Sequence, residues 1–292
     1  MKPACLIFLG LLLASGCANR IFYQPDRFLR PGPETRGLRV EDVVLEASDG
    51  VRLAAWWLPA EPPARGTVVH FHGNAQNMTT HVRFAEWLPA EGYHLLVFDY
   101  RGYGRSQGVP SRRGLVKDGV AALQWAAARE ENPGETLFIW GQSLGGTVAL
   151  QAFLQAEVPV AALLIDSTFT SHTRIAGEMM RRFPWFLQPL RLFRPLLVTP
   201  GLDAIQALPQ PEGLPIAFLH GAADPVIPPS HSERLFEAAG EPRHLWIIPG
   251  AGHCDAVLRF PELTRGLILG FFRSSETVPE RFPNFGNAEK DP

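Results

Sequence analysis

Short apolar runs recur along the chain, separated by segments rich in glycine, proline, asparagine and aspartate. Such runs predict buried strands at residues 67–71, 93–98, 136–140, 160–165, 216–219 and 244–248. The stretches between them predict helices at residues 79–91, 114–131, 144–156, 230–239 and 254–273. Strands that alternate with helices are typical of an α/β fold, in which a mostly parallel, twisted sheet is covered by helices on both faces.

Two more apolar segments, residues 43–45 and 51–58, flank Ser48-Asp49-Gly50. An Asp-Gly pair between apolar runs predicts an N-terminal hairpin, which adds antiparallel strands at one edge of the sheet. One domain over residues 40–273 accounts for these elements. Within it, about 167–214 predicts a small cap insertion, and Pro184, Pro189 and Pro195 exclude one long helix there. The polar residues 274–292 predict a disordered tail.

Composition excludes several classes of protein. The 292 residues are 46% hydrophobic with a net charge of −2, which excludes global disorder and argues against a nucleic-acid-binding protein, since such a protein needs a basic face. Three cysteines cannot form a disulfide scaffold. Because no His/Cys cluster has ligand spacing and no dinucleotide fingerprint follows a strand, we expect no metal and no cofactor.

The N-terminus predicts a targeting signal. Met1 and Lys2 precede an apolar stretch at residues 4–13, which is too short to span a membrane and suits a signal peptide. Ala14-Ser15-Gly16-Cys17 resembles the lipobox of bacterial lipoproteins. That resemblance implies removal of residues 1–16 and acylation of Cys17, and several acyl chains anchor a protein stably to a membrane. An ordinary secretory signal with an incidental cysteine is the alternative.

The residues that follow Cys17 add two expectations. Ala18, rather than aspartate, follows Cys17, and by the same resemblance this favours the outer membrane of the cell envelope, on its periplasmic side in a Gram-negative cell. Residues 17–39 contain several prolines and predict a lipidated stalk or lead-in between anchor and domain.

Ser143 is the candidate nucleophile. It lies in Gly141-Gln142-Ser143-Leu144-Gly145, which fits the pattern G-x-S-x-G between the strand at 136–140 and the helix at 144–156. This strand–turn–helix setting holds the serine in a strained backbone conformation, so its neighbours two positions away must be very small. A glycine-rich turn with a catalytically idle serine is the alternative interpretation.

Asp224 and His253 are the candidate acid and base. A serine hydroxyl needs a histidine to accept its proton, and that histidine needs an orienting carboxylate. Both residues follow Ser143 in the chain, and each lies just after a predicted strand, where open α/β sheets place their ligands. Asp166, at the end of the strand at 160–165, is the rival acid, and His172 in the predicted cap is a weaker rival base.

The backbone amides of Leu144 and Asn74 are the candidate oxyanion hole. A tetrahedral intermediate needs N–H donors that are fixed in advance. Leu144 follows the nucleophile, and Asn74 lies in the loop His72-Gly73-Asn74-Ala75 after the strand at 67–71, where its side chain is expected to brace the loop. His72 is a less favoured base because it precedes the serine in the chain.

Together these motifs resemble the α/β-hydrolases over roughly residues 40–273. The resemblance is to the branch with His-Gly-Asn-Ala at 72–75, Phe-Asp-Tyr-Arg-Gly-Tyr-Gly-Arg-Ser at 98–106 and Gly-x-Ser-Leu-Gly-Gly at 141–146. That branch includes bacterial envelope lipoproteins, protein depalmitoylases and lipid hydrolases. It implies a serine hydrolase with a Ser143, Asp224 and His253 triad, and we expect a monomer that acts on a small or lipid-like ester or thioester.

Two other function classes remain open: a serine aminopeptidase or peptidase acting on short peptides, and a non-catalytic envelope lipoprotein.

The cap, apolar with interspersed arginines, suits an acyl pocket, a membrane-facing surface or simple packing on its own domain. Cys254 directly follows the candidate base, and its free thiol is expected to be sensitive to modification.

Overall fold

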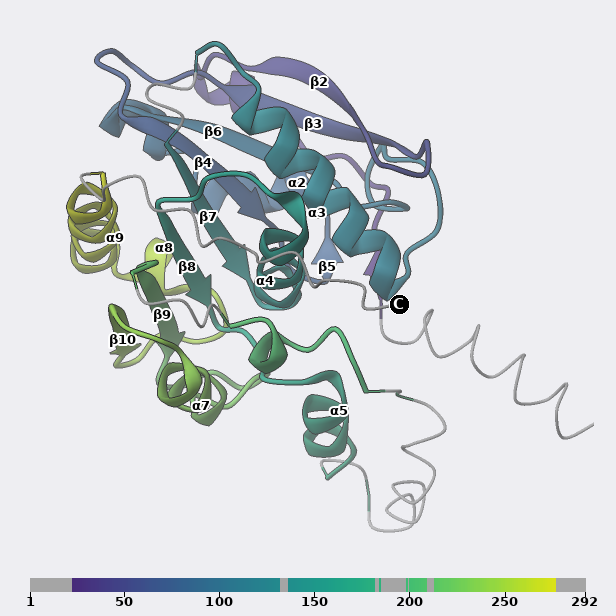
Figure 1. The fold of residues 1–292 in the computed structure, drawn as a ribbon, viewed down its shortest axis with the longest axis vertical. Helices are drawn as coiled ribbons and strands as arrows, with labels where there is room; N and C mark the ends of the chain where they lie inside the picture. Colours follow the sequence, from purple (N-terminus) through teal and green to yellow (C-terminus); the bar gives the residue numbers. More distant parts are fainter. Residues whose placement is uncertain are drawn as a thin grey trace, which may run out of the picture.

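The computed structural model describes residues 23–131, 136–181, 184, 198, 200–208 and 213–276. Its centre is an eight-stranded sheet in the order β10-β9-β8-β7-β4-β6-β3-β2 (Figure 1). The strands are β2 (Glu41–Glu46), β3 (Arg52–Leu58), β4 (Gly66–Phe71), β6 (Tyr93–Phe98), β7 (Leu137–Gln142), β8 (Ala162–Asp166), β9 (Ile216–Gly221) and β10 (Arg243–Ile248). Neighbours pair in parallel except at β6–β3 and β3–β2. The expected hairpin thus occupies one edge, and the mostly parallel sheet of an α/β fold is confirmed.

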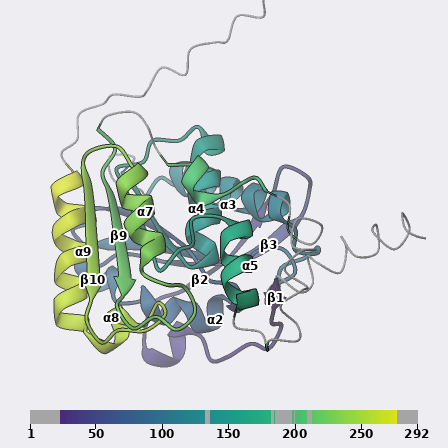
Figure 2. The same cartoon turned by 90° about the horizontal axis from the view of Figure 1, so that it is seen from below.

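Both faces of the sheet are covered, because its central strands β4, β6, β7, β8 and β9 are buried at every position. In β6, Leu96 and Phe98 face one core while Leu95 and Val97 face the other. The helices α3 (Arg112–Ala127), α4 (Leu144–Ala156) and α7 (Ser230–Ala238) pack on the first face. On the second face lie α2 (Met78–His81), α8 (Ala256–Arg259) and α9 (Pro261–Ser275) (Figures 1 and 2).

Two expected helices are each divided in the structure. The segment 79–91 forms α2 and the short 3₁₀ helices Val82–Phe84 and Leu88–Glu91 instead of one helix. Pro89 has no N–H to donate to the preceding turn, which prevents a continuous α-helix. The segment 254–273 is divided at Phe260, whose φ of −130° and ψ of 55° are not helical, because the following Pro261 at the start of α9 disfavours the helical conformation there.

The lead-in differs from the expected stalk, because from Tyr23 onward it packs on the domain. Strand β1 (Gln24–Pro25) pairs in parallel with β5 (Ala75–Gln76), in the loop that follows β4. Tyr23 is 3% exposed, and the 3₁₀ helix Pro33–Arg36 follows. The chain between residues 23 and 36 is therefore part of the domain, while Cys17 lies outside the described residues.

The cap insertion follows β8. Its described parts are α5 (His172–Arg181), the 3₁₀ helix Ala204–Gln206 and the neighbouring residues. Most of the apolar stretch with interspersed arginines, for which three roles were open, lies outside the described residues. The same is true of the predicted tail beyond residue 276. Among the described residues, no helix has the length and apolarity that crossing a membrane requires.

Candidate active site

Ser143 lies in a sharp turn between β7 and α4, as the sequence predicts. Its φ of 53° and ψ of −117° place a non-glycine residue in a strained region. The turn is held on one side by the Ser143 N–H, which donates to the Asp166 carbonyl at 2.8 Å. On the other side Gly145 permits close approach, because a Cβ there would overlap the carbonyl oxygens of Phe71 and His72. The backbone thus presents the serine side chain at the edge of the sheet.

Asp224 and His253 reach Ser143 from the two loops after the neighbouring strands β9 and β10. His253 Nε2 lies 3.0 Å from Ser143 Oγ, and His253 Nδ1 lies 2.7 Å from Asp224 Oδ2. The parallel pairing of β9 with β10 brings the carboxyl ends of both strands to the same edge, so two residues 29 positions apart meet. The structure therefore brings together the three side chains that the sequence singles out.

The protonation states follow from these contacts. Burial alone raises the pKa of Asp224, but hydrogen bonds from His220 and His253 outweigh it and hold the pKa below its usual value. Because ionised Asp224 only accepts, Nδ1 of His253 carries the proton and Nε2 accepts from the Ser143 hydroxyl. This arrangement is the one in which a histidine removes a proton from a serine.

The rival residues have other partners. Asp166 accepts hydrogen bonds from Gln142 Nε2 and Ser167 Oγ, both at 2.9 Å, and burial raises its pKa. His172 Nδ1 lies 2.8 Å from Asp203 Oδ1, away from the serine. His72 is buried with Nδ1 2.7 Å from the carbonyl of Gly73. Among these groups only Asp224 contacts His253.

The candidate oxyanion donors belong to two segments that lie next to Ser143. Leu144 is the first residue of α4, so its N–H has no acceptor within the helix. The loop that carries Asn74 passes close to the serine, since a Cβ at Gly73 would lie 3.7 Å from Ser143 Cβ. The Asn74 side chain braces this loop as expected, because its Oδ1 accepts from Tyr103 Oη at 2.9 Å and from the Gln24 N–H at 3.1 Å.

Two side chains beside the triad behave differently from the sequence interpretation. Cys254 is 7% exposed, and burial raises the pKa of its thiol well above the usual value, so the reactive thiolate is disfavoured. The burial of Cys254 therefore argues against the expected sensitivity to modification in the folded chain. His220, to which the sequence assigns no catalytic role, has Nε2 3.2 Å from Asp224 Oδ2. A histidine four residues before the predicted acid is the only sequence signal of this contact.

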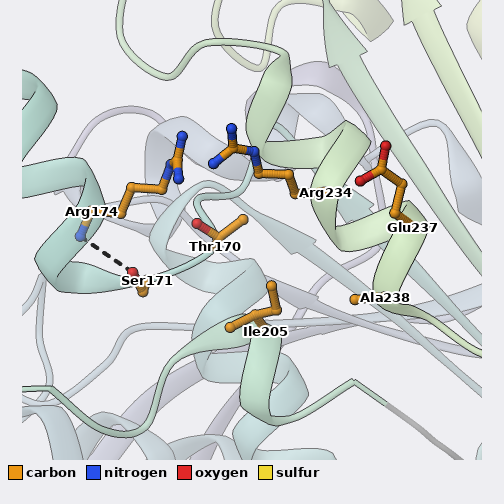
Figure 3. A pocket seen from close by; sticks show the side chains of 7 residues that line it. All are labelled: Thr170, Ser171, Arg174, Ile205, Arg234, Glu237 and Ala238. Carbon is orange, nitrogen blue, oxygen red and sulfur yellow. Dashed lines mark hydrogen bonds between the residues drawn. The ribbon is translucent and has the colours of Figure 1, made fainter.

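A separate pocket of about 470 Å³ lies between α5 and α7 (Figure 3). Arg174 and Arg234 extend toward one another over Thr170, and Ile205 and Ala238 lie below them (Figure 3). Arg174 is paired with Glu178, 3.1 Å away. None of the residues that line this pocket belongs to the Ser143 site. Within the described part of the chain, no group of three or more His, Cys, Asp or Glu side chains could hold a metal ion.

A family match, sequence relatives and solved structures all indicate the α/β-hydrolase fold. The family described as serine aminopeptidase, S33 matches residues 62–204. The Escherichia coli O157:H7 protein YfhR is 33% identical over 263 residues, which cover 88% of this chain and 87% of that protein. The Arabidopsis thaliana α/β hydrolase domain-containing protein WAV2 is 30% identical over 273 residues, covering 87% of this chain and 86% of WAV2.

Among solved structures, the Pyrococcus furiosus esterase Pf2001 is similar with a TM-score of 0.70 and 20% sequence identity. The match covers 87% of this chain and 98% of the esterase. An esterase from Exiguobacterium antarcticum is similar with a TM-score of 0.59 and 19% identity, over 80% of this chain and all of that one. At these identities the two likenesses show a shared fold.

Proposed function

This chain belongs to the α/β-hydrolase superfamily, and from that membership and the geometry of its site we propose that it is a serine hydrolase of carboxylic esters or thioesters. The observation that carries the proposal is His253, which lies within hydrogen-bond distance of both Ser143 Oγ and Asp224 Oδ2. A nucleophile, a base and an orienting acid in this order form the minimal unit for acyl transfer.

The reaction proceeds in two halves. Ser143 Oγ attacks the acyl carbon while its proton passes to His253 Nε2, and Asp224 stabilises the imidazolium that forms. The oxyanion lies against the N–H groups of Leu144 and Asn74. When the intermediate collapses, the bond to the alcohol or thiol breaks, His253 protonates the leaving group, and an acyl-enzyme remains. Water, deprotonated by His253, then releases the acid and restores Ser143.

An aminopeptidase is the second candidate, because the matching family is described by that activity. Such an enzyme needs a free carboxylate to bind the α-ammonium group of its substrate. Among the described residues at or after the carboxyl ends of β8, β9 and β10, the carboxylates of Asp166, Asp224 and Asp255 are already hydrogen-bonded within the protein. This use of the carboxylates favours the ester or thioester substrate.

We further propose that Cys17 carries a lipid anchor, which would hold the site near a membrane. Only six positions separate Cys17 from Tyr23, and a chain of that length spans at most about 20 Å. From Gln24 the chain is hydrogen-bonded to the loop of Asn74. An acylated Cys17 would therefore keep the catalytic edge close to the bilayer of the cell envelope, which suits a lipid-like acyl substrate.

The experiment that tests the proposal compares the wild type with Ser143→Ala. A fluorophosphonate probe is expected to label the wild type and the control variant Ser274→Ala. Ser274 suits a control because its hydroxyl donates to the Phe271 carbonyl in α9 and lies outside the site. Ser143→Ala should not be labelled. A panel of p-nitrophenyl acyl esters, acyl thioesters and aminoacyl anilides then separates the two candidate activities. Equal labelling of all three proteins, or no labelling at all, would leave the non-catalytic alternative.

A further inference from the structure

His220 has no place in the mechanism above, yet it lies directly behind the acid. It is the fifth residue of β9 and is completely buried. Its Nδ1 lies 2.7 Å from Ser232 Oγ in α7. On its other side, Nε2 lies 2.9 Å from the Ile227 carbonyl and 3.2 Å from Asp224 Oδ2. Both ring nitrogens therefore have partners within the protein.

These partners fix which nitrogen of His220 carries a proton. Nε2 faces two groups that only accept hydrogen bonds, a carbonyl and a carboxylate, so Nε2 must be protonated. Ser232 is the one partner of Nδ1 and can donate its hydroxyl hydrogen to it. A neutral ring with its proton on Nε2 satisfies every contact, and Ser232 selects that tautomer. Nε2–H is then shared between Ile227 O and Asp224 Oδ2.

The carboxylate of Asp224 is consequently held at both oxygens. Oδ1 accepts from the N–H groups of Val226 and Ile227 at 2.7 and 2.9 Å. Oδ2 faces both His253 Nδ1 and His220 Nε2. If only the backbone N–H groups held Oδ1, the planar carboxylate of Asp224 could still rotate about that oxygen. The contact with His220 holds the second end, which is the oxygen that orients His253.

We propose that His220 is a positioning residue of this site: its Nε2–H, fixed by Ser232, holds Asp224 Oδ2 in line with His253. The polar connection then runs Ser232, His220, Asp224, His253, Ser143. As far as it concerns turnover, the proposal rests on the proposed function, but the geometry of the His253–Asp224 hydrogen bond is a separate observable. This role accounts for a buried polar side chain at a position where an apolar residue could fill the same volume.

The chain offers a matched pair of variants at this position. In His220→Gln the side-chain amide places an N–H close to where Nε2 lies, so donation to Asp224 is retained. In His220→Asn the amide reaches only as far as Nδ1, so contact with Ser232 is retained and donation to Asp224 is lost. Both variants exchange a ring for a neutral amide, which makes the cost in packing similar.

The test measures kcat and KM with p-nitrophenyl acetate, together with the melting temperature. We expect His220→Asn to lower kcat by about 10- to 100-fold with KM little changed, since a displacement of about 1 Å at a distance from the reacting atoms can cost that much. His220→Gln should restore kcat to within a few-fold of the wild type. Ser232→Ala should lie between them. Equal losses in His220→Gln and His220→Asn, or no loss in either, would overturn the proposal.

A proton NMR measurement separates this proposal from the proposed function. The proton between His253 Nδ1 and Asp224 Oδ2 is expected to give a low-field resonance in the wild type and in His220→Gln, and to be weakened or absent in His220→Asn. If the wild type hydrolyses no ester, the proposed function fails while this comparison still decides the role of His220. If the resonance is the same in all three proteins, the positioning role fails even where hydrolysis is observed.

Discussion

Tyr103 donates its phenolic hydrogen to Oδ1 of Asn74, 2.9 Å away, and so connects two motifs that lie about thirty positions apart in the sequence. Tyr103 is completely buried, and its neighbour Tyr100 donates to the carbonyl of His72 at 3.1 Å. The aromatic residues of the segment 98–106 therefore support the loop 72–75 from below. The two motifs form one structural unit, whose effect is to fix a loop beside Ser143.

The first prediction concerns this support. Asn74→Ala keeps the backbone N–H assigned to the oxyanion hole but removes the acceptor for Tyr103 and Gln24, and Tyr103→Phe removes one donor. Because the loop then loses its fixed geometry, both variants should lower kcat by about 10-fold with little change in KM. Steady-state kinetics with a soluble ester checks this. A wild-type kcat in both variants would show that the side-chain contact is dispensable.

The sequence was sufficient for features set by local pattern. Apolar runs marked the strands, and glycines marked the strand–turn–helix around Ser143. One of them, Gly145, lies in close contact with the backbone of residues 71 and 72. The triad contacts were predictable because a catalytic motif marks them, but contacts between distant segments that no motif marks were not. Strand β1 and the loop of Asn74 pair through only two residues of each segment. His220 contacts Asp224 because the loop after β9 brings the carboxylate next to the ring, while Ser232 of α7 contacts the other ring nitrogen. The pattern of apolar and polar residues, which predicts helices and strands, does not indicate such contacts.

The second prediction distinguishes the two acids. Asp224→Asn leaves a neutral group beside His253 and favours the wrong tautomer, so kcat should fall by about 10³- to 10⁴-fold. Asp166→Asn disturbs hydrogen bonds with Gln142 and Ser167, which lie outside the acid–base pair. It should lower stability by about 1–3 kcal/mol with less than a 10-fold loss of kcat. Kinetics and urea unfolding measure both variants, and the reverse ranking of kcat would make Asp166 the acid.

The third prediction concerns the turn at Ser143. A Cβ at Gly145 would overlap the carbonyl oxygens of Phe71 and His72, so Gly145→Ala must move the turn away from β4. The variant should lose most of its activity and melt at a lower temperature. Gly266→Ala is the matched control, since apart from its chain neighbours and the nearby backbone of α9 itself, nothing lies within 4 Å of its Cβ position. That control should be fully active and about 0.5–1 kcal/mol more stable.

The fourth prediction is a pH dependence of stability. Burial raises the pKa of Asp99 to about 7, although the Met78 N–H donates to its carboxylate at 2.6 Å. The folded state therefore binds a proton that the unfolded chain has already released between about pH 4 and 7. Stability from this group is present below that window and is lost as the pH rises through it.

Asp99→Asn removes this titration, so its free energy of unfolding should fall less than that of the wild type between pH 5 and pH 8. Urea unfolding at the two pH values gives the difference for each protein. The comparison uses the change with pH rather than absolute stability, because the amide also alters local hydrogen bonding. Identical pH differences in the two proteins would mean that Asp99 ionises normally in the folded state.

The fifth prediction tests the lipid anchor. If Cys17 is acylated, protein produced in bacteria fed an alkyne analogue of palmitate should carry the label, and Cys17→Ser should not. Cys254→Ser is the control, because Cys254 is buried and its thiol has a raised pKa, so it should label like the wild type. Equal labelling of Cys17→Ser and the wild type, or a mature N-terminus at another residue, would remove the anchor. The short connection from Cys17 to Tyr23 would then no longer keep the Asn74 loop near a bilayer.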